Sequence, residues 1–151
     1  MGAAANLISE PADRVLKMER VFDAPRTLVF EAWTEPKHLM RWFAPNNFTV
    51  PACEMDFRAG GKFRLCMSGF GKDHWMNGVF REIVKNERIV WTSMLEHDNN
   101  EVVTTVTFTV VGGKTRLTVH QTYSLETDST RGAPQGWTET LEHLAEYLAD
   151  A

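Results

Sequence analysis

The sequence lacks several features that would identify a function at once. It has only two cysteines in 151 residues, and no apolar run is long enough to cross a membrane. Its start, MGAAANLISEPADR, lacks the charged segment and apolar core of a secretory signal. We therefore expect a cytoplasmic protein with reduced thiols and no membrane partner.

A basic tract is also absent. The 16 Lys and Arg residues are mixed along the chain with 20 Asp and Glu residues, which gives a net charge of -4. A nucleic-acid-binding surface needs clustered Lys and Arg to neutralise phosphates. We expect no nucleic-acid partner.

Catalytic and metal-binding motifs are missing too. There is no G-x-S-x-G turn, and neither cysteine has a histidine near it in sequence. The five histidines show neither H-x-x-x-H nor HExxH spacing: His38, His74, His97, His120 and His143. We expect no catalytic residue, no metal and no cofactor.

The C-terminal stretch 136–151 is strongly amphipathic. Four apolar residues follow a helical spacing of i, i+4, i+7 and i+11: Trp137, Leu141, Leu144 and Leu148. Three acidic residues lie on the opposite side: Glu139, Glu142 and Glu146. In a chain otherwise rich in strand-type alternation, such a helix must lay its apolar face on a sheet. We expect a curved antiparallel sheet closed around this helix.

The rest of the chain divides into a leader at residues 1–12 and a single domain at 13–151. A first strand is expected at 14–22, with Val15, Leu16, Met18 and Val21 as its apolar members. Two short helices follow, one capped by Asp23 and one, at 36–43, capped by Thr34. Six further strands are expected at 48–57, 61–67, 74–84, 88–96, 102–111 and 114–124. The inward face of 74–84 stays open between two phases: Trp75, Asn77, Val79 and Ile83, or Met76, Phe80 and Val84.

The first hairpin has one register that keeps both faces consistent. It pairs Phe57 with Gly61, Met55 with Phe63, Cys53 with Leu65, Glu54 with Arg64, and Asp56 with Lys62. The first three pairs give an apolar face, and the last two give opposite-charge pairs on the solvated face. Cys53 and Cys66 then lie on opposite faces, so no disulfide is expected.

The last hairpin, around Gly112-Gly113, places a polar pair on an apolar face. Its two-residue turn sets Thr104 opposite Gln121. A buried polar pair without partners costs about 1–3 kcal/mol. Either the two side chains bond to each other or lie near the end of the sheet, or they lie at a cavity and meet a ligand or water.

Several short motifs in order resemble those of one superfamily. They are Arg20-x-Phe22-x-Ala24-Pro25, Ala32-Trp33-Thr34-x-Pro36, Asp56-x-Arg58-x-Gly60-Gly61, Gly78-x-Phe80-x-Glu82-Ile83, Gly113-x-Thr115-x-Leu117-Thr118 and Gly136-Trp137-x-x-x-Leu141. The chain resembles the START/polyketide-cyclase-like (SRPBCC) superfamily, and within it a stand-alone bacterial member of the family named after the activator of heat-shock-protein-90 ATPase. The resemblance implies an α+β helix-grip fold, a seven-stranded antiparallel sheet around the C-terminal helix, often with an apolar pocket between them. Members include co-chaperones linked to stress response, carriers of hydrophobic molecules and enzymes.

Three functional hypotheses follow. The leading one is binding of a small apolar or aromatic ligand between sheet and helix, in a protein that is a monomer or homodimer. The predicted ligand-binding residues are Phe63, Leu65, Thr104, Phe108, Leu117, Gln121, Trp137, Leu141 and Leu144. Trp42, Trp75 and Trp91 are further candidates to frame the pocket. The alternatives are a chaperone-regulator-like module with a protein partner, and a cyclase- or hydrolase-like enzyme acting in the cavity.

Overall fold

The order of helices and strands follows the sequence prediction closely. A computed structural model describes residues 14–98, 100–123 and 125–150, so the predicted leader at 1–12 and residue 124 lie outside the described residues. The elements are β1 (Val15–Phe22), α1 (Arg26–Glu31), α2 (Pro36–Trp42), β2 (Thr49–Met55), β3 (Lys62–Gly69), β4 (Lys72–Val84), β5 (Arg88–Leu95), β6 (Val102–Val111), β7 (Lys114–Tyr123), α3 (Asp128–Arg131) and α4 (Ala133–Ala149). Only α3 was not predicted.

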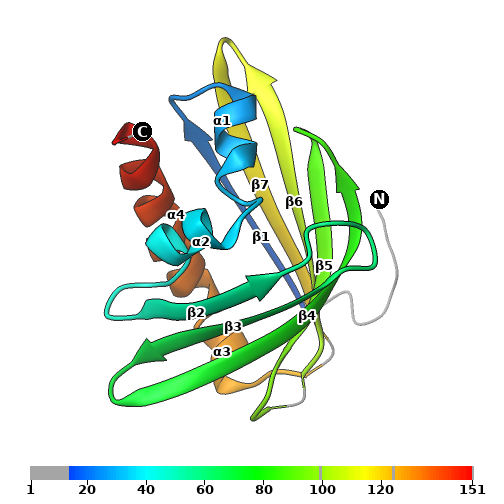
Figure 1. Cartoon of the computed structure of the whole chain (residues 1–151), viewed down its shortest axis with the longest axis vertical. Helices are drawn as coiled ribbons and strands as arrows, with labels where there is room; N and C mark the ends of the chain where they lie inside the picture. The colour runs from blue at the N-terminus through cyan, green and yellow to red at the C-terminus, as the bar shows by residue number, and fades with distance from the viewer. Residues whose placement is uncertain (1–13, 99, 124, 151) are drawn as a thin grey trace.

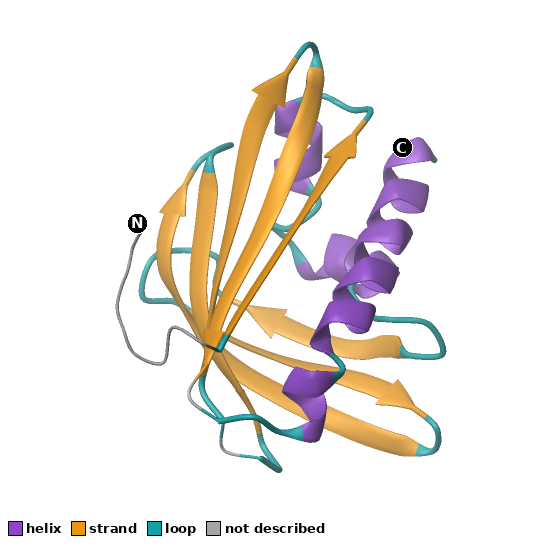
Figure 2. Ribbon diagram, turned by 180° about the vertical axis from the view of Figure 1, so that it is seen from behind, coloured by secondary structure: helices purple, strands orange, loops and turns teal. Residues whose placement is uncertain are grey.

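The seven strands form one antiparallel sheet in the order β1-β7-β6-β5-β4-β3-β2. The sheet bends strongly, so that β2, β3 and β4 run across the direction of β1, β7 and β6 (Figure 1). Helix α4 lies in the angle between these two groups of strands (Figure 2). The predicted α+β helix-grip fold is confirmed.

The predicted apolar stripe of α4 packs into the core. Leu141 and Leu144 are fully buried, and Trp137 and Leu148 are each 9% exposed. Glu142 on the other side forms an ion pair with Arg20 of β1 at 2.7 Å. The helix therefore holds the sheet through burial of one stripe and through the ion pair of Glu142 with β1 at its edge.

The predicted register of β2 and β3 is confirmed, but its charge pairs are not. Glu54 lies opposite Arg64, and both cysteines are free thiols. Arg64, however, pairs with Glu96 at 3.1 Å and lies over the ring of Trp75 at 3.8 Å. β3 is an interior strand, so Arg64 also has neighbours from β4 and beyond it, which the two-strand argument left out. Asp56 likewise pairs with Arg58 at 2.8 Å and not with Lys62.

The two phases considered for β4 each hold over part of the strand. Met76 and Phe80 face the core, and Trp75 lies on the outer face beneath Arg64. A bulge between Phe80 and Glu82 shifts the register, and Ile83 beyond it packs against the core. One extra residue in a strand reverses the alternation of its side chains.

Both predicted helix caps are wrong. Pro25 and Glu35 occupy the N-cap positions of α1 and α2, and neither makes a side-chain capping bond. The Thr34 hydroxyl donates instead to the Glu31 carbonyl at 2.9 Å, so it closes the end of α1. In β1, Leu16 and Met18 pack against the core, but Val15 and Val21 are exposed because they alternate to the outer face.

Candidate ligand-binding cavity

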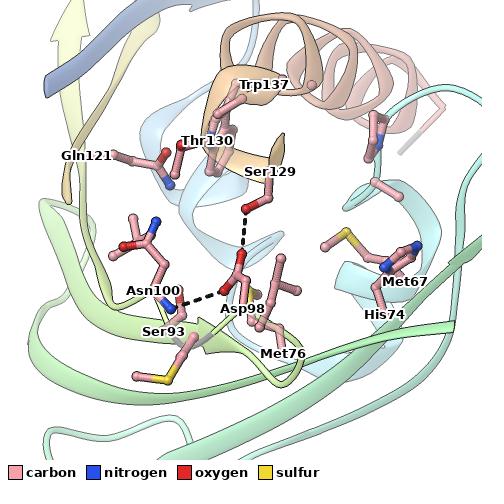
Figure 3. Close-up of a pocket in the computed structure, with 18 of the residues that line it drawn as sticks. Met67, His74, Met76, Ser93, Asp98, Asn100, Gln121, Ser129, Thr130 and Trp137 are labelled. Atoms are coloured by element: carbon pink, nitrogen blue, oxygen red, sulfur yellow. Dashed lines mark hydrogen bonds between the residues drawn. The ribbon is translucent and has the colours of Figure 1, made fainter. Parts of the chain in front are cut away.

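A cavity of about 570 Å³ lies between the sheet and the N-terminal half of α4. Its walls come from the concave face of β3 to β7, the segment joining α2 to β2, and α3 with the first turns of α4 (Figure 3). Pockets for small molecules typically measure about 300–1,000 Å³ and are lined mainly by apolar and aromatic side chains. The cavity has the size of a small-molecule site.

The apolar wall consists of aromatic rings and methionines. Trp91 and Trp137 face the cavity together with Met67 and Met76. Trp137 is held by stacking on Trp33, with ring centroids 6.4 Å apart and planes at 21°. The tryptophans are thus fixed in place, whereas methionine side chains adapt to the shape of what they contact.

A row of polar side chains crosses the concave face of β5, β6 and β7, and we call Ser93, Thr104 and Gln121 the polar row. The Gln121 amide nitrogen donates to the Thr104 hydroxyl at 3.0 Å. Thr104 is fully buried, whereas Gln121 lines the cavity. The first of the two alternatives for this pair is therefore correct, and Gln121 is also in a position to meet a ligand.

The rim of the cavity is a hydrogen-bonded junction between the β5–β6 loop and α3. Asp98 accepts a bond from the Ser129 hydroxyl at 2.8 Å and from the Asn100 backbone N–H at 3.1 Å (Figure 3). The Asn100 side chain in turn donates to the Leu125 carbonyl at 2.8 Å. These donors satisfy the Asp98 carboxylate, which makes it a structural anchor of this wall.

Sequence reasoning missed α3, although a signal for it exists. Thr127 and Thr130 form a reciprocal capping box, in which each side chain bonds to the backbone N–H of the other. The usual capping-box signature has Glu or Gln as its last residue, so Thr127-x-x-Thr130 is harder to recognise in the sequence. This helix carries Ser129 and Thr130 to the cavity.

Two histidines distant in sequence meet at the opposite side of the cavity. The Nδ1 atom of His74 and the Nε2 atom of His97 lie 3.3 Å apart, and His74 packs against Phe48. Met76 pairs with Leu95 across β4 and β5, and continuing this register by two residues brings the histidines together. Within the described ranges, no three His, Cys, Asp or Glu side chains are grouped to hold a metal ion.

The predicted ligand-binding residues fall into three groups. Gln121 and Trp137 line the large cavity, and Phe63 and Leu65 line a second cavity of only about 30 Å³. The others line neither cavity and are fully buried in the core: Thr104, Phe108, Leu117, Leu141 and Leu144. Of the candidate tryptophans, Trp91 lines the large cavity, Trp42 is buried, and Trp75 lies on the outer face.

The position of the cavity explains this division. The C-terminal half of α4 presents large leucines that fill the space above the sheet, whereas its start presents Ala133 and Gly136. A Cβ atom placed on Gly136 would have no neighbour within 4 Å. The prediction followed the apolar stripe of the helix, but a cavity forms where that stripe is interrupted by small residues.

The cysteines are poor nucleophiles. Burial, together with the nearby Glu54 carboxylate, raises the pKa of Cys53 to about 11. Burial also raises the pKa of Cys66. Thiols with raised pKa values stay protonated at neutral pH, and the thiolate is the reactive form.

Comparison with known families agrees with this fold. Residues 23–149 match the family model of the Activator of Hsp90 ATPase homolog 1-like proteins. The chain belongs to this family. A search of curated proteins found no match.

Solved structures of the same fold come from several bacteria. Protein CV1439 from Chromobacterium violaceum has 25% identity and a TM-score of 0.82, over 90% of this chain and 97% of its own. NE0264 from Nitrosomonas europaea has 25% identity and a TM-score of 0.81, over 93% and 97%. A protein from Rhizobium leguminosarum has 29% identity and a TM-score of 0.74, over 91% and 95%. In the described part of the chain, none of the helices is long and apolar enough to cross a membrane.

Proposed function

We propose that this family member binds a small apolar or aromatic molecule in the cavity beneath the start of α4. The observation that carries the proposal is a cavity of about 570 Å³ whose walls include two tryptophans and three methionines. An unfilled apolar cavity lowers the free energy of unfolding, so this space does not serve stability. A bound ligand would recover that loss.

The charged groups of the cavity favour binding over catalysis. Each carboxylate oxygen of Asp98 already accepts a hydrogen bond, one from the Ser129 hydroxyl and the other from the Asn100 N–H. His74 and His97 bond to each other, which occupies one nitrogen of each ring. A cyclase- or hydrolase-like activity would need one of these groups to exchange its partner for the substrate.

A surface function of the chaperone-regulator kind is the alternative. One feature favours it: Phe70, at the tip of the β3–β4 hairpin, is 76% exposed and has a positive φ of 53°. A bulky residue in that conformation is unfavourable and adds little to the core. A role for Phe70 in contacting a protein partner would account for its presence there.

A thermal-shift screen of apolar and aromatic compounds tests the proposal. At a concentration 100 times its Kd, a ligand that binds only the folded chain adds about 2.7 kcal/mol to stability. The matched control is Gly136→Phe, whose ring would occupy the open space next to the cavity. Hits should stabilise the wild type and not this variant. The cavity is not the working site if no compound stabilises the wild type, or if hits act equally on both proteins.

A further inference from the structure

Two residues of the polar row, Ser93 and Gln121, present polar atoms to the cavity that have no partner among the described residues. Ser93 is 8% exposed and lines the cavity, and no described residue bonds to its hydroxyl. The Gln121 amide uses its nitrogen on Thr104, and its oxygen has no partner among the described residues. On the facing helix α4, Thr140 is 5% exposed and lines the cavity, and its hydroxyl also has no partner among the described residues. These three polar groups are open to the cavity and not enclosed by protein, so a ligand bound there can form hydrogen bonds with them.

The sheet register places the two strand residues around one point. Trp91 pairs with Thr104, and Thr104 pairs with Gln121. Ser93 is two residues beyond Trp91 on the same face, which makes it a diagonal neighbour of Thr104 at roughly 7–8 Å. The Gln121 side chain reaches back over Thr104, as its hydrogen bond shows. Ser93 on β5 and the Gln121 amide from β7 therefore lie on either side of Thr104 on the same concave face, and both line the cavity.

The lack of charged side chains in the polar row favours a neutral ligand group at Ser93 and Gln121. The ionisable side chains lining the cavity are His74, His97, Asp98 and Asp128, and none belongs to the polar row. The residues of the polar row are themselves uncharged, so they offer no counter-ion to a charged group, and an unpaired buried charge is costly. A carboxylate or an ammonium group is disfavoured at this point.

A hydroxyl group fits these partners best. It donates to the Gln121 oxygen and accepts from the Ser93 hydroxyl at the same time. If the amide were turned so that Thr104 donates to its oxygen, the amide nitrogen would face the cavity, and a hydroxyl would accept from it equally well. A carbonyl group only accepts, so it matches one of these two arrangements.

We propose that the ligand is a neutral hydroxylated molecule, an alcohol or phenol on an apolar body, whose hydroxyl binds between Ser93 and Gln121. Thr140 contacts the same end of the ligand from α4. This inference rests on the proposed function and specifies the chemistry recognised by the same cavity.

The test compares naphthol with methylnaphthalene, which differ only in a hydroxyl replaced by a methyl group. Each compound displaces the fluorescent dye N-phenylnaphthylamine from the wild type, Ser93→Ala, Gln121→Leu and the control Thr105→Val. A purely apolar site favours the methyl compound, whereas two hydrogen bonds favour naphthol by about three- to tenfold. Ser93→Ala and Gln121→Leu should each bring the ratio close to one. Thr105→Val, on the outer face of the sheet, should leave the wild-type ratio unchanged.

The measurements distinguish failure of the hydroxyl inference from failure of the proposed ligand-binding function. A wild-type ratio of one or below, or a naphthol preference that survives both Ser93→Ala and Gln121→Leu, overturns the hydroxyl inference and leaves the cavity as a ligand site. If the dye and both compounds fail to bind the wild type, the proposed function itself is wrong. Thermal melts of each variant show that it is folded, and Ser93→Ala deletes a hydroxyl to which none of the described residues bonds.

Discussion

Arg20 of β1 and Glu142 of α4 form a 2.7 Å ion pair that joins the first strand to the helix gripped by the sheet. The Glu142 side chain is 54% exposed, and exposed pairs contribute about 0–1 kcal/mol. Leu144 on the opposite stripe is fully buried, so Leu144→Ala should cost about 2–5 kcal/mol. Urea melts of Leu144→Ala and Glu142→Ala measure both effects, and equal losses would contradict this orientation of α4.

The same substitution at two glycines should have opposite effects. A Cβ atom on Gly78 would lie 2.1 Å from the Phe63 ring, whereas one on Gly136 would meet nothing within 4 Å. Gly78→Ala should therefore lower the free energy of unfolding by about 1–3 kcal/mol through overpacking. Gly136→Ala should raise it by about 0.5–1 kcal/mol, because glycine is a poor helix former. Denaturant melts of the pair decide the matter, and destabilisation by Gly136→Ala would mean that this part of the cavity is filled.

The two thiols should react slowly in the folded protein. The pKa of Cys53 is raised to about 11 and that of Cys66 is raised as well, both mainly by burial. Raised pKa values favour the protonated thiol, so this contribution to stability is present below the ordinary thiol pKa and is lost as the pH rises toward the folded values. An Ellman assay at pH about 8 should show slow reaction in buffer and fast reaction of both thiols in urea, near the unperturbed cysteine pKa of about 8.5. Fast reaction of the folded protein would contradict the partial burial of Cys53 and the full burial of Cys66.

His120 should titrate below the usual histidine range. Partial burial lowers its pKa, and the charge of Lys17 on the neighbouring strand lowers it further. The folded state thus favours neutral His120, and its contribution to stability is lost as the pH falls below the ordinary value of about 6.5. An NMR titration should give a midpoint below that value in the wild type, and a higher one in Lys17→Gln that stays below it because burial remains. A wild-type midpoint at or above the ordinary value would contradict this environment.

Local patterns predicted the fold well because each depends on few residues. The Gly112-Gly113 turn alone specifies the register of β6 and β7, including the pair of Thr104 with Gln121. The apolar spacing of α4 likewise identified the leucines that fill the core. The predicted ion pair of Glu54 with Arg64 failed because of a third neighbour: Arg64 pairs with Glu96, since an interior strand has partners on both sides.

The cavity was less predictable because it depends on what is small or missing. Gly136 and Ala133 leave space that no apolar pattern marks. His74 and His97 meet only through the β4–β5 register, which the bulge after Phe80 obscures in the sequence. In the sequence Ser93 is one polar residue in a strand, and its place in the cavity wall becomes visible only when the strands are placed.

Methionine methyl groups offer the most direct measurement of where a ligand binds. Met67, Met76 and Met94 line the cavity, whereas Met40 lies on α2, 38% exposed and away from it. With methyl-labelled methionine, NMR spectra would be recorded as N-phenylnaphthylamine is added to the wild type and to Gly136→Phe. We predict saturable changes in the methyl chemical shifts of Met67 and Met76 in the wild type, no change for Met40, and little change in the variant. Saturable binding that leaves the cavity methyl groups unmoved, or that shifts Met40 alone, would contradict it.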